Sequence, residues 1–296
     1  MKIAIIGQSG QLARALLREG ANQNIDIESY SRKQCDLSSA PEIIECFIHG
    51  LQVDAVILAA AYTAVDAAEQ DYETAFAVNA RAPEAIANAC AQKGFALVHV
   101  STDYVFKGDA KSPYLVSAPT NPINTYGLSK CLGEQAVMKA HEGAAVLRTS
   151  WVFDGTGKNF MTTMLRLGAA HDAISIVNDQ IGRPTYAGHL AQACLAVAGA
   201  LCRDNHARHS GIYHVTNSGD AISWAGFATA IFARLEKTLE KAVRVTPIPS
   251  SDYPTPADRP AYSVLDLSRF ETLHGTLPHW HEGLELAYTE WANNKI

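Results

Sequence analysis

The chain opens with Lys2-Ile3-Ala4-Ile5-Ile6, followed at once by Gly7-Gln8-Ser9-Gly10-Gln11-Leu12-Ala13. The apolar run is typical of a buried strand, and a helical pattern begins at Gln11. Between them, Gly7 permits a tight turn, Gly10 lets backbone approach a pyrophosphate, and Ala13 allows close helix–strand packing. The free N–H groups of the helix start then face the phosphates. This turn predicts a dinucleotide site, against the alternative of an ordinary strand–turn–helix unit.

Strands and helices keep alternating through the first half of the chain. The pattern predicts strands at 25–30, 54–59, 95–100 and 144–149, and helices at 11–19, 41–49, 72–92 and 126–140. Such alternation is typical of a parallel sheet covered by helices on both faces. We therefore expect an α/β fold, a Rossmann-type doubly wound parallel sheet with a smaller C-terminal α/β substrate lobe.

After Trp151 the alternation of strands and helices becomes less regular. Helices are predicted at 160–168, 187–202, 224–235 and 282–293, short strands at 174–177 and 212–215, and a proline-rich stretch at 247–260. We assign residues 1–150 to a NAD(P)-binding domain and 151–296 mainly to the substrate lobe, with some later segments returning to the first domain.

Composition narrows the class of protein. The 296 residues are 48% apolar and carry a net charge of −6, so a large core is expected and nucleic-acid binding is not. No apolar run approaches the ~20 residues of a membrane span, and Met1-Lys2 leads straight into the first strand, so we expect neither a membrane partner nor a signal peptide. The six cysteines form no CxxC pair and the histidines no HExxH motif, which favours reduced thiols, a cytoplasmic location and no metal site.

The end of the second predicted strand bears on the cofactor's ribose. An acidic residue there is typical of NAD binding, whereas this chain has Ser31 and Arg32. These two side chains suit a 2′-phosphate, so NADPH is expected, with NADH as the alternative if they form only a solvated turn. Asp36 and Leu37 follow beside the expected adenine, and the small residues Ala59-Ala60-Ala61 let a cofactor lie against backbone.

Two later segments carry the groups for ketone reduction. Ser101-Thr102-Asp103-Tyr104 ends the fourth predicted strand, and Tyr126-Gly127-Leu128-Ser129-Lys130 opens the next helix. Tyr126 and Lys130 are four residues apart and so share one helix face. A phenol has a pKa of about 10, and a neighbouring ammonium together with the oxidised nicotinamide is expected to stabilise the phenolate and lower that pKa. The Thr102 hydroxyl is expected to hydrogen-bond the substrate oxygen.

These motifs resemble the extended short-chain dehydrogenase/reductases and, within them, the dTDP-4-dehydrorhamnose reductases. The resemblance covers essentially the whole chain and rests also on residues 59–66, 148–153, 178–185 and 253–260. It implies NAD(P)H-dependent reduction of the C4 ketone of dTDP-4-dehydro-β-L-rhamnose to dTDP-β-L-rhamnose, the last step in making activated rhamnose for surface polysaccharide.

The resemblance also assigns residue roles. Tyr126 is implied as the proton donor, Lys130 as its partner and Thr102 as the substrate hydrogen bond. The implied substrate contacts are Thr102, Asp103 and Trp151. The implied cofactor contacts are Gly10, Gln11, Leu12, Asp36, Leu37, Ala61, Tyr62, Thr63, Tyr126 and Lys130, to which the turn and strand ends add Gly7, Ser31, Arg32 and Ala60.

The substrate's diphosphate calls for a cation. Arg148, Arg166, Arg183 and Arg259 are candidates, of which Arg259 is preferred because a proline-rich loop is able to fold over a cleft.

Some relatives of this kind dimerise around magnesium held by glutamates. Here the first helix offers Ala13, Arg14 and Ala15, and His189 stands on the later helix, so we expect a monomer or a homodimer without a magnesium bridge.

Two other functions stay open at this point. The first is another enzyme on the same scaffold, either a related 4-ketoreductase that gives the C4 epimer, dTDP-6-deoxytalose, or a nucleotide-sugar epimerase. A non-catalytic module resembling the regulatory subunit of methionine adenosyltransferase is the second, although a pure scaffold has no use for Tyr126 beside Lys130.

Overall fold

The computed structural model describes residues 1–203, 206–239 and 242–294. Within these ranges, six parallel strands form the main sheet, in the order β10-β5-β4-β3-β1-β2. Their bounds are β1 (Lys2–Ile6), β2 (Asp26–Tyr30), β3 (Ala55–Leu58), β4 (Ala96–Thr102), β5 (Ala145–Thr149) and β10 (Gly211–His214). The predicted α/β class with a parallel sheet is confirmed.

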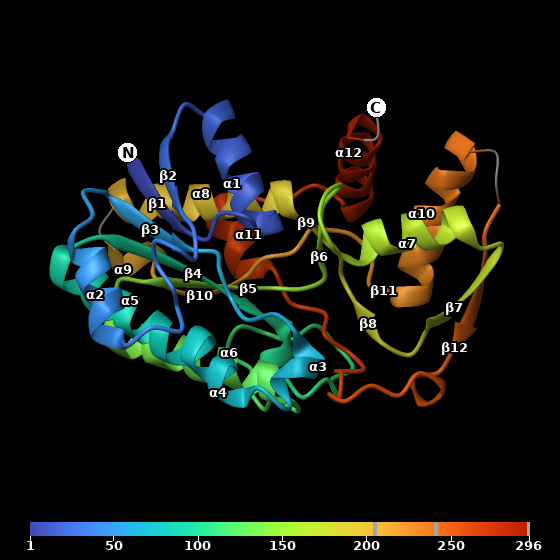
Figure 1. Ribbon diagram of the computed structural model, residues 1–296, viewed down its shortest axis with the longest axis horizontal. Coiled ribbons are helices and arrows are strands. Elements are labelled where there is room, and N and C mark those ends of the chain that lie inside the picture. The colour runs from blue at the N-terminus through green and yellow to red at the C-terminus, as the bar shows by residue number, and fades with distance from the viewer. Residues whose placement is uncertain (204–205, 240–241, 295–296) are drawn as a thin grey trace.

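Helices cover both faces of this sheet, as Figure 1 shows. One face packs against α1 (Gln11–Asn22), α8 (Ala187–Arg203) and α11 (Ser268–His274). The other packs against α2 (Pro41–His49), α5 (Ala82–Lys93) and α6 (Thr125–Ala140). Because both faces are buried, strands such as Ala55–Leu58 read as continuous apolar runs.

The order of the strands creates the binding crevice. β1 and β3 are neighbours, and the connection that leaves the carboxyl end of β1 runs to β2 on one side, whereas the connection that leaves β3 runs to β4 on the other side. Open α/β sheets bind ligands at such a switch point. Gly7 stands there with φ +121°, and a Cβ on it would lie 3.1 Å from the Ala60 nitrogen.

The long helix predicted over 72–92 is three joined segments. α4 (Tyr72–Phe76) runs into a π-helical turn (Ala77–Arg81) and then into α5, which ends at Gly94 with φ +70°. Pro83 explains the wide turn, because its ring lacks an N–H for the Asn79 carbonyl and would clash with it in a regular α-helix. π-turns of this kind often mark functional sites.

A smaller lobe follows β5. It consists of β6 (Val152–Phe153), α7 (Phe160–Ala170), β7 (Ala173–Val177), β8 (Ile181–Gly182), β9 (Thr185–Tyr186), β11 (Ile222–Ser223), α10 (Trp224–Leu239), β12 (Arg244–Ile248) and α12 (Trp280–Asn293). Its own core is built around Phe153, Phe227 and Trp280. The chain returns to the main sheet through α8, α9 (His206–His209), β10 and α11.

The proline-rich stretch is more ordered than its composition indicates. Its start belongs to β12, which pairs in parallel with β7, and a 3-10 turn follows at Ser250–Asp252. Residues 249–267, called the strap below, connect the small lobe to α11, and Figure 1 shows this segment running along the lower edge of the small lobe before it rises to α11. The Ser263 nitrogen donates to the Ile181 carbonyl (2.8 Å), and the Tyr262 nitrogen to that of Gly108 (3.0 Å).

No helix within the described residues is long and apolar enough to cross a bilayer.

Candidate active site

A cavity of about 1030 Å³ opens at the carboxyl ends of the central strands and extends to β6 of the small lobe. The predicted site residues that line it are Gly7, Gly10, Gln11, Leu12, Arg32, Asp36, Leu37, Ala60, Ala61, Tyr62, Thr63, Thr102, Asp103, Tyr126, Lys130 and Trp151. The predicted residues that do not line it are Ser31, Arg259 and the other arginine candidates, Arg148, Arg166 and Arg183.

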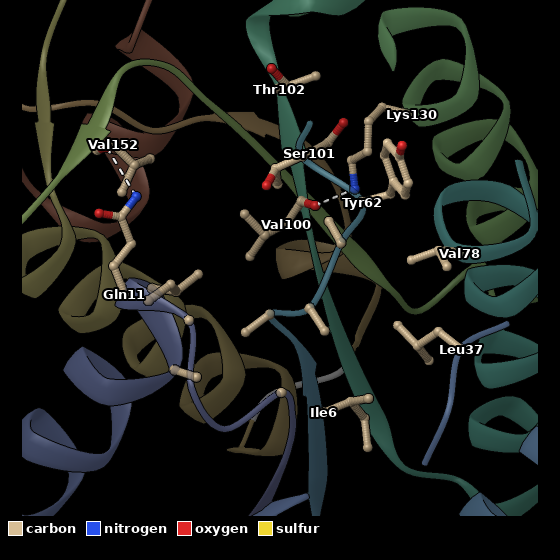
Figure 2. Close-up of a pocket in the computed structure, with 18 of the residues that line it drawn as sticks. Ile6, Gln11, Leu37, Tyr62, Val78, Val100, Ser101, Thr102, Lys130 and Val152 are labelled. Atoms are coloured by element: carbon tan, nitrogen blue, oxygen red, sulfur yellow. Dashed lines mark hydrogen bonds between the residues drawn. The ribbon is translucent and has the colours of Figure 1, made fainter. Parts of the chain in front are cut away.

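The glycine turn has room for a phosphate group. A Cβ on Gly10 would meet no atom within 4 Å, so the backbone at the start of α1 is open to the cavity. Gln11 spans the two lobes, because its Nε2 donates to the Val152 carbonyl (3.0 Å), as Figure 2 shows. Among the described residues, its buried Oε1 has no hydrogen-bond partner. An acceptor left free in this way fits a bound polar ligand.

The β2 end of the cavity carries a weak ion pair. Arg32 Nε lies 3.3 Å from Asp36 Oδ2, and the arginine side chain is 76% exposed. The pKa of Asp36 lies below its usual range, mainly because Ser38 donates hydrogen bonds to its carboxylate. The Ser31 hydroxyl instead donates to Gln34 Oε1 (2.8 Å). Arg32 is therefore free to turn toward an anion, whereas Ser31 is engaged elsewhere.

Thr102, Asp103 and Tyr126 form a buried polar group. The Thr102 hydroxyl donates to Asp103 Oδ1 (3.0 Å), accepts from the Tyr104 nitrogen (3.2 Å), and is hydrogen-bonded to the Tyr126 phenol. Burial raises the pKa of Asp103 to about 6, although hydrogen bonds from Ser263 and Thr102 oppose the shift. Ser263 comes from the strap, so the last part of the chain completes this group.

Burial raises the pKa of Tyr126 to about 12, against a smaller lowering by Thr102. Desolvation of the phenolate is the largest cause of the raised pKa, so the proton stays on Tyr126 at neutral pH. The lowering of this pKa by Lys130 and an oxidised nicotinamide together, which the sequence predicts, stays a prediction.

Lys130 is almost completely buried at 2% exposure. Its ammonium donates to the Val100 carbonyl (2.7 Å), and Figure 2 shows this bond beside Ser101. Burial lowers the pKa of Lys130 to about 8, while the charge of Glu134 opposes the change. The ammonium is thus held at the edge of β4 and borders the cavity.

Two polar residues were missed as site residues. Ser101 lines the cavity, and its buried hydroxyl has no partner among the described residues. Asn79, in the π turn, exchanges two hydrogen bonds of 2.9 Å with the Tyr62 backbone and donates to Ser129 Oγ (3.0 Å). Ser129 in turn donates to the Tyr126 carbonyl (2.8 Å). A buried amide within an alanine-rich helix was the available signal for Asn79.

Trp151 sits at the small-lobe side of the cavity in an unusual conformation. Its φ is +48°, which is rare for a bulky residue. The indole stacks on Trp224 with ring centroids 3.5 Å apart and planes 7° apart. A Cβ on Gly182 would fall 2.5 Å from the Trp151 ring. Packing therefore holds this side chain in one place at the rim.

Three of the four arginine candidates for the diphosphate are engaged elsewhere. Arg148 is buried in a bidentate pair with Glu134, the closest contact being 2.7 Å, so its expected role is not supported. Arg183 donates to the Gly219 carbonyl (2.9 Å). Arg259 pairs with both carboxylate oxygens of Asp66, at 2.9 and 2.7 Å. Neither these three nor Arg166 lines the cavity.

The strand order, the glycine turn and the Thr102–Tyr126–Lys130 group together define a Rossmann-type reductase of the short-chain dehydrogenase/reductase class. The sequence matches the family model of the RmlD substrate binding domain over residues 1–293. This chain belongs to that family.

Individual relatives agree with this assignment. The chain is 41% identical over 293 residues to a dTDP-4-dehydrorhamnose reductase of Burkholderia thailandensis, with 97% of each chain covered. It is 38% identical to a probable dTDP-4,6-dihydroxy-2-methyloxan-3-one 4-ketoreductase of Streptomyces antibioticus, covering 98% of this chain and 95% of that one. The crystal structure of dTDP-4-dehydrorhamnose reductase from Bacillus anthracis in complex with NADP superposes with a TM-score of 0.88 at 35% identity, covering 98% and 100% of the two chains.

Proposed function

We propose that this chain is an NAD(P)H-dependent reductase that converts the C4 ketone of dTDP-4-dehydro-β-L-rhamnose to the alcohol of dTDP-β-L-rhamnose. The observation that carries the proposal is that Thr102, Tyr126 and Lys130 border the same cavity as the glycine turn. Full-length similarity to dTDP-4-dehydrorhamnose reductases supports the choice of substrate.

The proposed cofactor site has two ends. At one end the start of α1, with Gly7, Gly10, Gln11 and Leu12, would hold the pyrophosphate. Arg32 would pair with a 2′-phosphate, and Asp36 and Leu37 would border the adenosine. At the other end Lys130 would donate to the nicotinamide ribose, and Ala60, Ala61, Tyr62 and Thr63 would line the path between them. A reduced nicotinamide bound there supplies a hydride for the carbonyl carbon.

The side chains would carry the proton part of the reaction. Tyr126 would give its phenolic proton to the C4 oxygen as negative charge develops there. Its high pKa keeps that proton in place until the reaction occurs. The Thr102 hydroxyl would hydrogen-bond the same oxygen, and the Lys130 ammonium would stabilise the negative phenolate that remains.

The remaining proposed substrate contacts are Asp103, Trp151 and Arg259. Asp103 and Trp151 line the cavity, which supports a role near the sugar. For Arg259 the present partner is Asp66, so contact with a diphosphate would require an exchange of partners.

A second candidate is reduction to the C4 epimer. The 38% identical relative is named as a probable 4-ketoreductase of a different dTDP-sugar, so similarity of this degree does not fix the stereochemistry of the product. The non-catalytic module is disfavoured, because it gives no reason to bury a phenol and an ammonium beside an open cavity.

We also propose a cytoplasmic monomer or homodimer without a magnesium bridge. Arg14 pairs with Asp154 (3.1 Å), and the His189 ring is hydrogen-bonded to Asn217 (2.6 Å), which supports structural roles for both positions. The six free cysteines support a reducing compartment. Sedimentation with and without EDTA tests the oligomeric part.

The test of function is direct. Purified protein is mixed with NADPH and dTDP-4-dehydrorhamnose, the fall in NADPH absorbance is followed, and the product is identified by NMR. Formation of dTDP-β-L-rhamnose supports the proposal, and the C4 epimer would replace it with the second candidate. Absence of turnover by protein that binds NADPH would overturn the assignment of substrate.

A further inference from the structure

The buried ammonium of Lys130 has a second neighbour that the proposed mechanism does not use. His99 lies in the middle of β4 and is 1% exposed. Its Nε2 is 3.4 Å from Lys130 Nζ. On the other side of the ring, Nδ1 is buried and has no partner among the described residues.

The charge on Lys130 determines the proton position on this ring. Burial, and then the Lys130 charge, keep the pKa of His99 well below its usual range, so the imidazole is neutral. A neutral imidazole has one N–H and one acceptor nitrogen. If Nε2 carried the hydrogen, an N–H would point at an ammonium. The proton therefore sits on Nδ1, and the Nε2 lone pair faces Lys130.

This arrangement orients all three ammonium hydrogens. One goes to the Val100 carbonyl (2.7 Å) and a second to His99 Nε2. An ammonium has three donors in fixed tetrahedral directions. Lys130 borders the cavity, so the third donor is available to a group bound there.

We propose that His99 is a positioning residue, which holds the Lys130 ammonium so that its remaining donor faces the ribose of a bound nicotinamide cofactor. This inference rests on the proposed function. The unpaired Nδ1 hydrogen supports it, because a buried donor without a partner is destabilising and a leucine would fill the same space without one. Leu97, two residues earlier on the same face of β4, is such an apolar residue, and it packs in a hydrophobic cluster.

The charged or titratable groups around Lys130 are few in the described part of the chain. Glu134 lies one helical turn later and raises the pKa of Lys130, Tyr126 lies one turn earlier, and His99 faces it from β4. Arg148 holds the Glu134 carboxylate in place, so replacing His99 leaves the electrostatic effect of Glu134 on Lys130 unchanged.

Three substitutions separate an acceptor role from packing. His99→Gln extends an amide oxygen to about the place of Nε2, His99→Asn holds the same amide near Nδ1, and His99→Leu has no acceptor. The readout is the Kd for NADPH, measured by fluorescence titration between pH 6 and 10 without any sugar. Thermal unfolding of each variant reports packing separately.

We expect His99→Gln to bind NADPH within about threefold of the unchanged protein, whereas His99→Asn and His99→Leu bind about tenfold more weakly, the effect of one charge-assisted hydrogen bond. In these two variants the pH at which NADPH binding weakens should also fall by about one unit. Lys130→Met provides the reference, because it should bind NADPH weakly at every pH and show no pH at which binding weakens further.

Equal Kd values and equal midpoints for the three His99 variants would overturn the inference and leave His99 as a packing residue. If His99→Leu does not fold, the comparison of His99→Gln with His99→Asn is sufficient by itself, because the two side chains carry the same amide and differ only in length. Failure of the unchanged protein to reduce the sugar would count against the proposed function, but the NADPH measurements would still decide the role of His99.

Discussion

Tyr126 shows how strongly burial changes the chemistry of a side chain. A phenol in water has a pKa of about 10, and in this cavity desolvation raises it to about 12. The proton is therefore fully retained at neutral pH, which suits a group that must donate it during reduction. The proposed role of Lys130 is accordingly to stabilise the phenolate after proton transfer.

Replacement of Tyr126 by phenylalanine should remove the proton without removing the ring. We expect Tyr126→Phe to keep NADPH affinity and to lose about 10²-fold or more in kcat. Tyr104→Phe is the matched control, because Tyr104 packs edge-on against Tyr126 with ring centroids 5.5 Å apart and is partly buried. Steady-state kinetics of both variants provide the test, and near-normal kcat for Tyr126→Phe would exclude the phenol from the mechanism.

Lys130 should make NADPH binding dependent on pH. Burial depresses the pKa of its ammonium to about 8, so the charged fraction falls as the pH rises through that value. The Kd for NADPH should therefore be constant near pH 6 to 7 and increase above about pH 8. A titration series from pH 6 to 10 measures this, and a flat profile would show that the ammonium does not hold the cofactor.

Arg32 should discriminate between the two nicotinamide cofactors. Its guanidinium is exposed and its pairing with Asp36 is long, so it is available to a 2′-phosphate. We expect Arg32→Ala to weaken NADPH binding about tenfold and to leave NADH binding unchanged. Lys33→Ala, at an exposed neighbour outside the cavity lining, is the control. Equal losses for both cofactors would contradict this role.

At the scale of elements, the π turn links three parts of the site. Asn79 fastens the Tyr62 loop to the turn and, through Ser129, reaches the backbone of Tyr126. The turn also brings its own backbone against α6, because a Cβ on Gly133 would lie 2.0 Å from the Asn79 carbonyl oxygen. The contact is therefore possible only with glycine at this position.

Gly133→Ala should push α6 away from the π turn. Since the obstacle is backbone, we expect a loss of about 2 kcal/mol in the free energy of unfolding, together with lower kcat. The control is Gly199→Ala in α8, where the nearest atoms belong to the flexible end of Arg203. That change should be neutral or stabilising by about 0.5–1 kcal/mol. Urea unfolding measures both, and equal effects would disprove the contact argument.

At the scale of the whole molecule, the strap joins the two lobes across the site. Arg259 fastens it to Asp66 in the short helix α3 (Val65–Ala68), the Asp258 carbonyl accepts from Asn124 Nδ2 (2.7 Å), and Ser263 reaches Asp103. The side chain of Asp66 is 41% exposed, so the ion pair contributes at most about 1 kcal/mol to stability. Its main effect is on the position of the strap.

Two matched variants separate a fastening role for Arg259 from substrate binding. If the pair only fixes the strap, Arg259→Ala and Asp66→Ala should raise the KM for the dTDP-sugar by similar factors, about tenfold, with NADPH affinity unchanged. A much larger KM effect for Arg259→Ala alone would show that its guanidinium also contacts the diphosphate. Initial rates at varied sugar concentration make the distinction.

Local patterns predicted most of the main sheet and its helices. Strand 2–6 and helix 41–49 were predicted at their observed bounds, and other ends in the first half shift by a few residues. Long, strongly patterned segments are predictable because burial of one face dominates their energy. β6, β8, β9 and β11 are two residues long and exist through pairing with distant partners, which no local pattern contains.

The sequence alone determined the α/β class, through the alternation of strands and helices along the first half of the chain. It also predicted the glycine turn and the residues Thr102, Tyr126 and Lys130, because these depend on spacing within short segments. Only the tertiary structure revealed that Arg148 is buried against Glu134, that Arg259 faces Asp66, that His99 contacts Lys130 and that Asn79 contacts Ser129. These properties depend on which distant groups share a buried space, and in such a space the loss of solvent decides charge and hydrogen bonding.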